Sequence, residues 1–203
     1  MNTVTHPGVR ILTIGHSNRP LDDFIALLHE NGITQLVDIR RYPGSRKWPH
    51  FNKEPLADAL AKERVFYVWL EHLGGRRHGV PRASSPNQGL TSDAFRNYAD
   101  YMADPVFQHA VSRLVHLAGA MPTAIMCAEK LFWKCHRRIL SDYLAAHGVE
   151  VIHIIDHSRT QPHKLSAGAV VGDDGMVTYP PAQGDLFPEP VHRSSFPPVQ
   201  IGG

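Results

Sequence analysis

The sequence predicts an α/β fold, namely a single Rossmann-like three-layer domain with a mostly parallel sheet of about five strands. Short apolar runs alternate with longer segments whose apolar residues recur at helical spacing, from about residue 9 to residue 156. Strands separated by helices are typical of a parallel sheet that is covered on both faces. A length of 203 residues, 42% of them hydrophobic, supplies one full core and is too short for two ordinary domains.

The first part of the chain predicts three strands and two helices. The apolar run at 9–14 is followed by helical spacing over 21–30, where Asn31 and Gly32 supply a stop signal. The second strand is expected at 34–39. A short helix at 54–63 and a third strand at 65–70 follow.

The second part predicts three helices, two strands and a small hairpin. Asp104 and Pro105 are a helix cap and a first-turn proline, and Gly148 is a stop signal. These signals place helices at 92–102, 104–117 and 134–147, and strands at 123–127 and 149–155. The segment 168–179 is compatible with a hairpin around Asp173-Asp174-Gly175.

The predicted domain extends over residues 9–179, between two segments of different character. Residues 1–8 are expected to be a flexible N-terminus. From Pro180 to the C-terminus most residues are proline, glycine or polar, so we expect 180–203 to be a disordered tail.

Composition restricts the class of protein. The net charge of +2 is small, so any argument for nucleic-acid binding must rest on where the charges lie. No apolar run is long enough to span a bilayer, and the N-terminus lacks the apolar core of a signal peptide. Two cysteines without a secretion signal favour reduced thiols. We therefore expect a cytoplasmic protein with no membrane partner.

Four ordered motifs carry a resemblance to a known family. They are Gly15-His16-Ser17, Val37-Asp38-Ile39-Arg40 followed by Pro43-Gly44-Ser45, Leu73-Gly74-Gly75, and Cys127-Ala128-Glu129 followed by Cys135-His136-Arg137. Together they resemble the family designated domain of unknown function 488 (DUF488), over nearly the whole chain. This resemblance implies no particular activity.

A fainter similarity is to rhodanese and related thiol phosphatases. Those proteins also combine a strand end of the type Val-Asp-Ile-Arg with a cysteine, a phosphate-binding loop and a helix. Here the loop at 130–133 is Lys-Leu-Phe-Trp, which lacks the glycine and serine that let backbone N–H groups close around an anion. The departure weakens the prediction of a cysteine nucleophile.

Four residues are predicted to be catalytic because they lie at or beside the carboxyl ends of predicted strands, where doubly wound sheets bind ligands. They are Glu129, Asp38, His16 and Cys127. Carboxylates at an apolar rim serve as acid or base, and they stabilise charge in glycosidic cleavage. The alternatives are a structural ion pair of Asp38 with Arg40, a capping role for His16, and a packing role for Cys127.

Cations and aromatic rings follow the second, third and fourth strands, and this mixture is typical of a surface for a flipped base or a single strand. The predicted substrate-binding residues are Ser17, Arg40, Arg46, Lys47, Trp48, Phe51, Arg76, Arg77, Cys135, His136 and Arg137. The alternative interpretation is ordinary solvated loops. A helix opening at Cys135 would present free N–H groups to an anion.

No cofactor is predicted. Cys127, Cys135 and His136 are zinc donors by type, but their spacing matches no recognised zinc pattern.

The segment 183–187, Gln-Gly-Asp-Leu-Phe, resembles the Gln-x-x-Leu-Phe peptide by which bacterial repair and replication proteins dock on the sliding clamp. Leu186 and Phe187 would enter an apolar groove, and Gln183 would bond at its edge. The alternative is that the two apolar residues pack on the protein's own core.

Our leading hypothesis is a DNA-associated bacterial enzyme of DNA repair that catalyses a hydrolytic step, such as cleavage of an N-glycosidic bond. The first alternative is a rhodanese- or phosphatase-like enzyme with Cys127 as nucleophile. The second is a non-enzymatic nucleic-acid-binding adaptor.

Overall fold

The computed structural model of the protein describes residues 5–181. The segment 183–187 lies outside the described residues, as do residues 1–4 and nearly all of the predicted tail. The hypotheses that rest on these segments therefore stay predictions. The part that is described bears on the fold and on the site at the strand ends.

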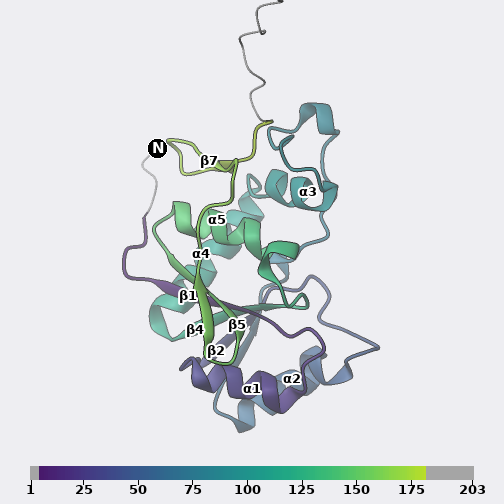
Figure 1. Cartoon of the computed structure of the whole chain (residues 1–203), viewed down its shortest axis with the longest axis vertical. Helices are drawn as coiled ribbons and strands as arrows, with labels where there is room; N and C mark the ends of the chain where they lie inside the picture. The colour runs from purple at the N-terminus through teal and green to yellow at the C-terminus, as the bar shows by residue number, and fades with distance from the viewer. Residues whose placement is uncertain (1–4, 182–203) are drawn as a thin grey trace, which may run out of the picture.

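A six-stranded sheet forms the centre of the fold (Figure 1), which confirms the predicted α/β class with a mostly parallel sheet. The order is β3-β2-β4-β1-β5-β6, and only the pairing of β5 with β6 is antiparallel. The strands are β1 (Arg10–Gly15), β2 (Gln35–Asp38), β3 (Phe66–Trp69), β4 (Thr123–Cys127), β5 (Glu150–Asp156) and β6 (Arg159–Pro162). β7 (Val170–Val171) and β8 (Val177–Thr178) pair as the small hairpin that was expected at 168–179.

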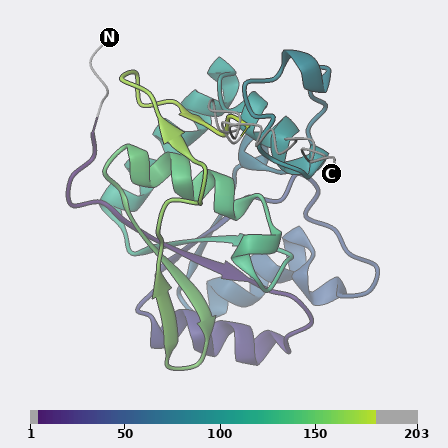
Figure 2. The ribbon, with the colours of Figure 1, turned by 45° about the horizontal axis from the view of Figure 1, so that its top comes forward.

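Helices cover both faces of the sheet, so the fold has three layers (Figure 2). One layer holds α1 (Leu21–Glu30) and α2 (Lys53–Lys62), whose apolar residues pack on the sheet with Phe24 at the centre. The other holds α3 (Asp93–Tyr101), α4 (Pro105–Ala120) and α5 (Arg137–Ala146), with Tyr98 and Phe107 fully buried. Asp104 caps α4, because its side chain accepts a hydrogen bond from the backbone N–H of Val106.

The structure differs from the prediction in two places that matter for the site. α5 begins at Arg137 and not at residue 134, because a 3₁₀ turn (Phe132–Lys134) precedes it. The sheet has a sixth strand, β6, which is exposed along its length. Its sequence, Arg-Thr-Gln-Pro, has no apolar alternation that would indicate a strand.

The strand order brings the ends of β1 and β4 side by side. β4 lies between β2 and β1, so Gly15 pairs with Cys127 at the carboxyl edge. A β-carbon on Gly15 would collide with the backbone carbonyl of Glu129 and with the Arg137 guanidinium. Glycine is therefore required where the loop after β4 crosses the end of β1.

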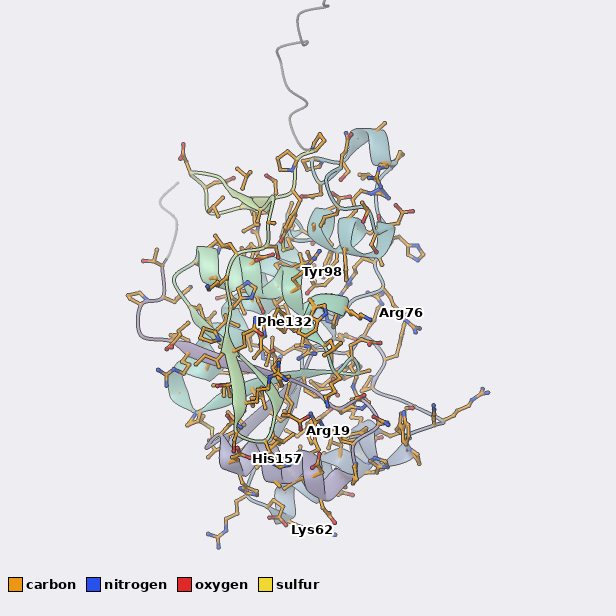
Figure 3. All side chains as sticks on the ribbon, viewed as in Figure 1. Arg19, Lys62, Arg76, Tyr98, Phe132 and His157 are labelled. Carbon is orange, nitrogen blue, oxygen red and sulfur yellow. The ribbon has the colours of Figure 1, made fainter. Side chains whose placement is uncertain are left out.

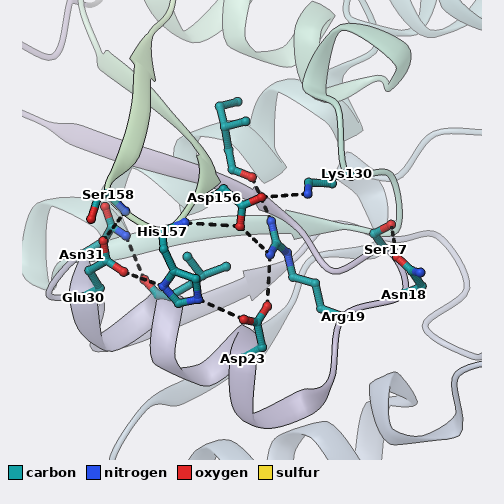
Figure 4. Close-up of polar contacts among 12 residues, drawn as sticks. Ser17, Asn18, Arg19, Asp23, Glu30, Asn31, Lys130, Asp156, His157 and Ser158 are labelled. Carbon is teal, nitrogen blue, oxygen red and sulfur yellow. Dashed lines mark hydrogen bonds and ion pairs between the residues drawn. The ribbon is translucent and has the colours of Figure 1, made fainter.

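A group of ion pairs and hydrogen bonds fixes the loops that follow β1 and β4 (Figure 4). Arg19 and Lys130 both form ion pairs with Asp156, at 3.0 Å and 2.9 Å. Arg19 also binds Asp23 of α1 at 3.0 Å, and its second terminal nitrogen donates to the backbone oxygen of Ile155 at 2.8 Å. The end of β5 thus holds both loops in place beside the sheet.

Candidate active site

A pocket of about 880 Å³ opens at the carboxyl ends of β1, β2 and β4. This is the edge at which open α/β sheets bind their ligands. Ten of the residues predicted from the sequence line it: His16, Ser17, Arg40, Lys47, Trp48, Arg76, Cys127, Glu129, Cys135 and His136. The fold thus brings together side chains that are up to 120 positions apart in the chain.

Two thiols lie side by side at this pocket. The Sγ atoms of Cys127 and Cys135 are 2.8 Å apart, and both cysteines are free and almost fully buried. β4 supplies the first, and the 3₁₀ turn before α5 returns the chain so that the second lies against it. Cys135 also has Nδ1 of His136 at 3.3 Å and the backbone N–H of Arg137 at 3.5 Å.

The two thiols differ in acidity. Burial alone would raise the pKa of Cys135, but the hydrogen bond from Cys127 and the charge of Arg137 outweigh it and lower the pKa to about 7. Burial and the hydrogen bond to Cys135 raise the pKa of Cys127 well above its ordinary value. The pair therefore holds one proton near neutral pH, with the negative charge on Cys135.

Arg137 lies behind the thiols and is fully buried. Its Nε donates to Cys127 Sγ at 3.0 Å, and its terminal nitrogens donate to Thr13 and to the backbone oxygens of Glu129 and Lys130. Within residues 5–181 no carboxylate forms an ion pair with it. A buried cation requires a compensating charge, so the thiolate is its counter-ion.

His16 is neutral and has both ring nitrogens engaged. Burial and the charge of Arg40 lower the pKa of His16 to about 4. Nδ1 lies 2.9 Å from the backbone oxygen of Ser17, so it carries the proton and donates it there. Nε2 then accepts from Arg40 at 3.3 Å, and the ring stacks on Phe51. This geometry fits a side chain that shapes the pocket wall better than it fits a free base.

Asp38 lies below the pocket surface and is fully buried. Arg40 binds both of its oxygens, and the Tyr67 hydroxyl donates to Oδ2 at 2.6 Å. The backbone N–H of Arg40 donates to Oδ1 at 2.9 Å. Since these partners surround the carboxylate, the structure favours the ion-pair interpretation of Asp38 over a catalytic role.

Glu129 is the acidic residue of the pocket lining. It is exposed, and its carboxylate makes no hydrogen bond or ion pair with any residue in the described part of the chain. Its backbone oxygen, by contrast, accepts from Arg137. The main chain of Glu129 is therefore fixed while its carboxylate faces solvent and any bound ligand.

The rest of the lining is cationic and aromatic. Arg41, Lys47, Arg76 and Lys134 supply charge, and Tyr42, Trp48 and Phe95 supply rings. Arg76 extends from its loop near one edge of the molecule (Figure 3). Ala94 and Phe95 were not predicted, because α3 follows no strand directly and its place beside the pocket depends on tertiary packing.

Five predicted residues do not line the pocket. Asp38 and Phe51 lie beneath it, and Arg137 lies behind the thiols. Arg46 is exposed outside it. Arg77 folds onto its own loop, where Nε donates to the backbone oxygen of Gly74 at 2.9 Å and the guanidinium lies 3.9 Å from the ring centroid of Tyr101. The sequence pattern shows which strand each of these residues follows but not which way its side chain points.

Residues 5–181 contain neither a metal-binding cluster nor a membrane-spanning helix. No cluster of three or more His, Cys, Asp or Glu side chains there has an arrangement suited to a metal ion. No helix within that range has both the length and the apolar character needed to cross a membrane.

Comparisons with known proteins give one match. The model of a family described as domain of unknown function DUF488 matches residues 20–144, which is more than half of the chain. The match includes Cys127, Glu129, Cys135 and Arg137 and ends before β5. No curated protein and no solved structure matched the chain.

Proposed function

Since the chain belongs to the DUF488 family, and this family name implies no reaction, we propose from the chemistry of the pocket that the protein is a cysteine-dependent hydrolase. Its substrate is a phosphate ester carried by a nucleic-acid strand or a nucleotide. The observation that carries the proposal is the buried thiol pair, in which the pKa of Cys135 is about 7 beside a fully buried arginine. The hypothesis of a cysteine enzyme is thus retained, with Cys135 in place of Cys127 as the nucleophile.

The proposed reaction has two steps. The Cys135 thiolate attacks phosphorus, the P–S bond forms, the P–O bond to the leaving group breaks, and the leaving alkoxide takes a proton from a water molecule, which becomes hydroxide. Water then attacks phosphorus, the P–S bond breaks, and phosphate and the thiolate are released. The Glu129 carboxylate accepts the proton of this attacking water as a base and passes it to the hydroxide left by the first step.

The cations of the lining support the substrate class. Arg41, Lys47, Arg76 and Lys134 surround an opening whose lining holds one acidic residue. Phosphates are bound mainly by such side chains, and rings such as Trp48 stack on bases. The end of a nucleic-acid strand, or a free nucleotide, offers a phosphate and a base within a single nucleotide unit.

A second candidate function rests on Glu129. Its carboxylate is exposed and unpaired among the described residues, which suits a base that activates water for cleavage of an N-glycosidic bond. That reaction does not use the thiols. A DNA-repair role is compatible with either reaction.

The two candidates are separated by turnover of a panel of damaged and end-modified oligonucleotides and of nucleotides. Cys135→Ser should abolish activity if the thiol is the nucleophile, and Glu129→Gln should then slow the reaction without abolishing it. The opposite result, with Glu129→Gln inactive and Cys135→Ser active, favours the glycosidic reaction. DNA binding that survives both changes, without turnover by the parent protein, would indicate the adaptor.

We further propose that residues 183–187 dock on the bacterial sliding clamp, which would bring the enzyme to DNA during repair. The proposal is supported by the sequence of this segment, since Leu186 and Phe187 are the apolar anchors that such a groove accepts. In the full chain, changing both to alanine should remove binding to purified clamp. The matched change of Val199 and Ile201 to alanine should not. Equal affinity of the two double variants would contradict docking through this segment.

A further inference from the structure

A line of buried polar side chains extends from Arg137 away from the pocket. Arg137 donates to Thr13 Oγ1 at 3.3 Å, and Thr13 Oγ1 lies 2.7 Å from Nδ1 of His153. Nε2 of His153 is 3.0 Å from Nδ1 of His163. Nε2 of His163 is 2.9 Å from Oδ1 of Asp142. Five side chains from four separate parts of the sequence therefore form one hydrogen-bonded line.

The direction of each hydrogen bond follows from the two ends. The Asp142 carboxylate only accepts, so Nε2 of His163 carries a proton and donates it. In the tautomer with its proton on Nε2, Nδ1 of His163 accepts from Nε2 of His153. Nδ1 of His153 is left without a proton and accepts from the Thr13 hydroxyl, whose oxygen accepts from Arg137. Every donor has an acceptor, so one set of tautomers satisfies the whole line.

The line is enclosed by protein. Thr13, His153 and Asp142 are fully buried, and the side chain of His163 is 2% exposed. The Phe132 ring, from the same turn that positions Cys135, stacks on His153 with 3.5 Å between the ring centroids. Polar groups are costly to bury, and a fully satisfied network fixes the positions of its members.

Asp142 is itself fixed by the last described part of the chain. The Tyr179 hydroxyl donates to Oδ2 at 2.6 Å, and the backbone N–H of Ser166 donates to Oδ1 at 2.8 Å. Burial opposes its ionisation, but the hydrogen bonds from His163, Tyr179 and Ser166 lower the pKa of Asp142. The carboxylate is thus a charged, fixed end of the line, and Arg137 is the other end.

We propose that Thr13, His153, His163 and Asp142 are positioning residues, which hold the Arg137 guanidinium against the thiol pair and so keep Cys135 as a thiolate. This inference rests on the proposed function, since it concerns the same nucleophile. It extends the site to residues 150–179, beyond the segment that matches the family. None of the four residues lines the pocket, so none touches substrate.

The test is the pH dependence of alkylation of Cys135 by iodoacetamide in the full chain, with the label assigned by peptide mass spectrometry. Thr13→Val keeps the shape of the side chain and removes the link between Arg137 and His153. Thr13→Ser is the matched control, because it keeps the hydroxyl. We expect Thr13→Val to raise the pKa of Cys135 by about one unit, which reduces the thiolate population at pH 7 about fivefold. Thr13→Ser should leave the profile unchanged.

The outcomes distinguish the positioning role of the buried residues from the proposed function of Cys135. A wild-type pKa near 7 with the same profile in Thr13→Val would overturn the positioning role and leave the proposed function intact. An ordinary wild-type thiol pKa would overturn the proposed function itself. If Thr13→Val does not fold, His153→Gln is measured in the same way, since it breaks the line at its centre. An unchanged profile in that variant refutes the inference.

Discussion

Replacing Arg137 by glutamine should make Cys135 an ordinary thiol. Glutamine retains hydrogen-bond donors for the backbone oxygens that Arg137 now binds, but it has no charge. The thiolate would lose its counter-ion while it stays buried. Because burial alone raises the pKa of a thiol, we expect the pKa of Cys135 to return from about 7 to its ordinary value of 9.0 or above.

The effect on reactivity follows from this change. With a pKa of 9, the thiolate fraction at pH 7 is about 1%, against about a half when the pKa is 7, so the population falls about 50-fold. A thiolate of higher pKa is a better nucleophile, and a Brønsted coefficient of about 0.45 recovers about eightfold over two units. The rate of alkylation at pH 7 should therefore fall by about sixfold.

The assay is the rate of iodoacetamide alkylation at Cys135 as a function of pH. Arg137→Lys is the matched variant, because it keeps the charge and loses the planar fork. Its pKa should stay closer to 7 than that of Arg137→Gln. Circular dichroism and urea unfolding serve as the controls that test whether both variants are folded.

A folded Arg137→Gln protein with an alkylation pKa still near 7 would refute the reasoning. It would mean that Cys127 and the backbone N–H of Arg137 are sufficient to hold the thiolate. If the pKa of Cys135 instead rises equally in Arg137→Gln and Arg137→Lys, the planar fork of the guanidinium matters more than its charge.

Three further predictions concern the pair, the core and the pH response. Cys127→Ala removes the S–H that donates to Cys135, so alkylation of Cys135 should shift to higher pH in a titration with iodoacetamide. Asp38→Asn breaks a buried ion pair and should lower the free energy of unfolding by about 3–5 kcal/mol in urea, whereas Tyr67→Phe should cost about 1–3 kcal/mol. The pKa values of His16 and His153 are lowered to about 4 and about 3, so the unfolded chain takes up these protons first as the pH falls below 6.5. From pH 7 to pH 5 each of these two histidines should lower the free energy of unfolding by about 2 kcal/mol. His16→Gln should therefore remove half of the combined loss. Equal unfolding curves of the wild-type protein at the two pH values would contradict this.

Local pattern predicted most of the fold because strands and helices leave periodic signals. The strand at Thr123–Cys127 was predicted with the bounds that the structure has, and the stop signals at Gly32 and Gly148 each lie two residues beyond the ends of α1 and α5. β6 was missed because an exposed edge strand needs no apolar alternation. The order of the strands was also beyond local pattern, since it is decided by which helices pack on which face.

Ten of the residues predicted for the site line the pocket at the carboxyl ends of the strands, but the sequence did not indicate how the two cysteines lie relative to one another. Cys135 follows a bulky loop, and from sequence this argued against a reactive thiol. In the structure the loop forms the 3₁₀ turn that lays Cys135 against Cys127. The buried line behind Arg137 was not predicted, because Thr13 and His153 are 140 positions apart and share no motif.

The central claim is that Cys135 is a thiolate at neutral pH, and the most direct measurement is the ultraviolet absorbance of thiolate in the wild-type protein during a pH titration, with Cys135→Ser as the reference. The structure predicts a difference between the two proteins that titrates with a midpoint near pH 7 and reaches one thiolate per chain. A difference that appears only in the range of an ordinary thiol, about pH 8.5 or above, would contradict the claim.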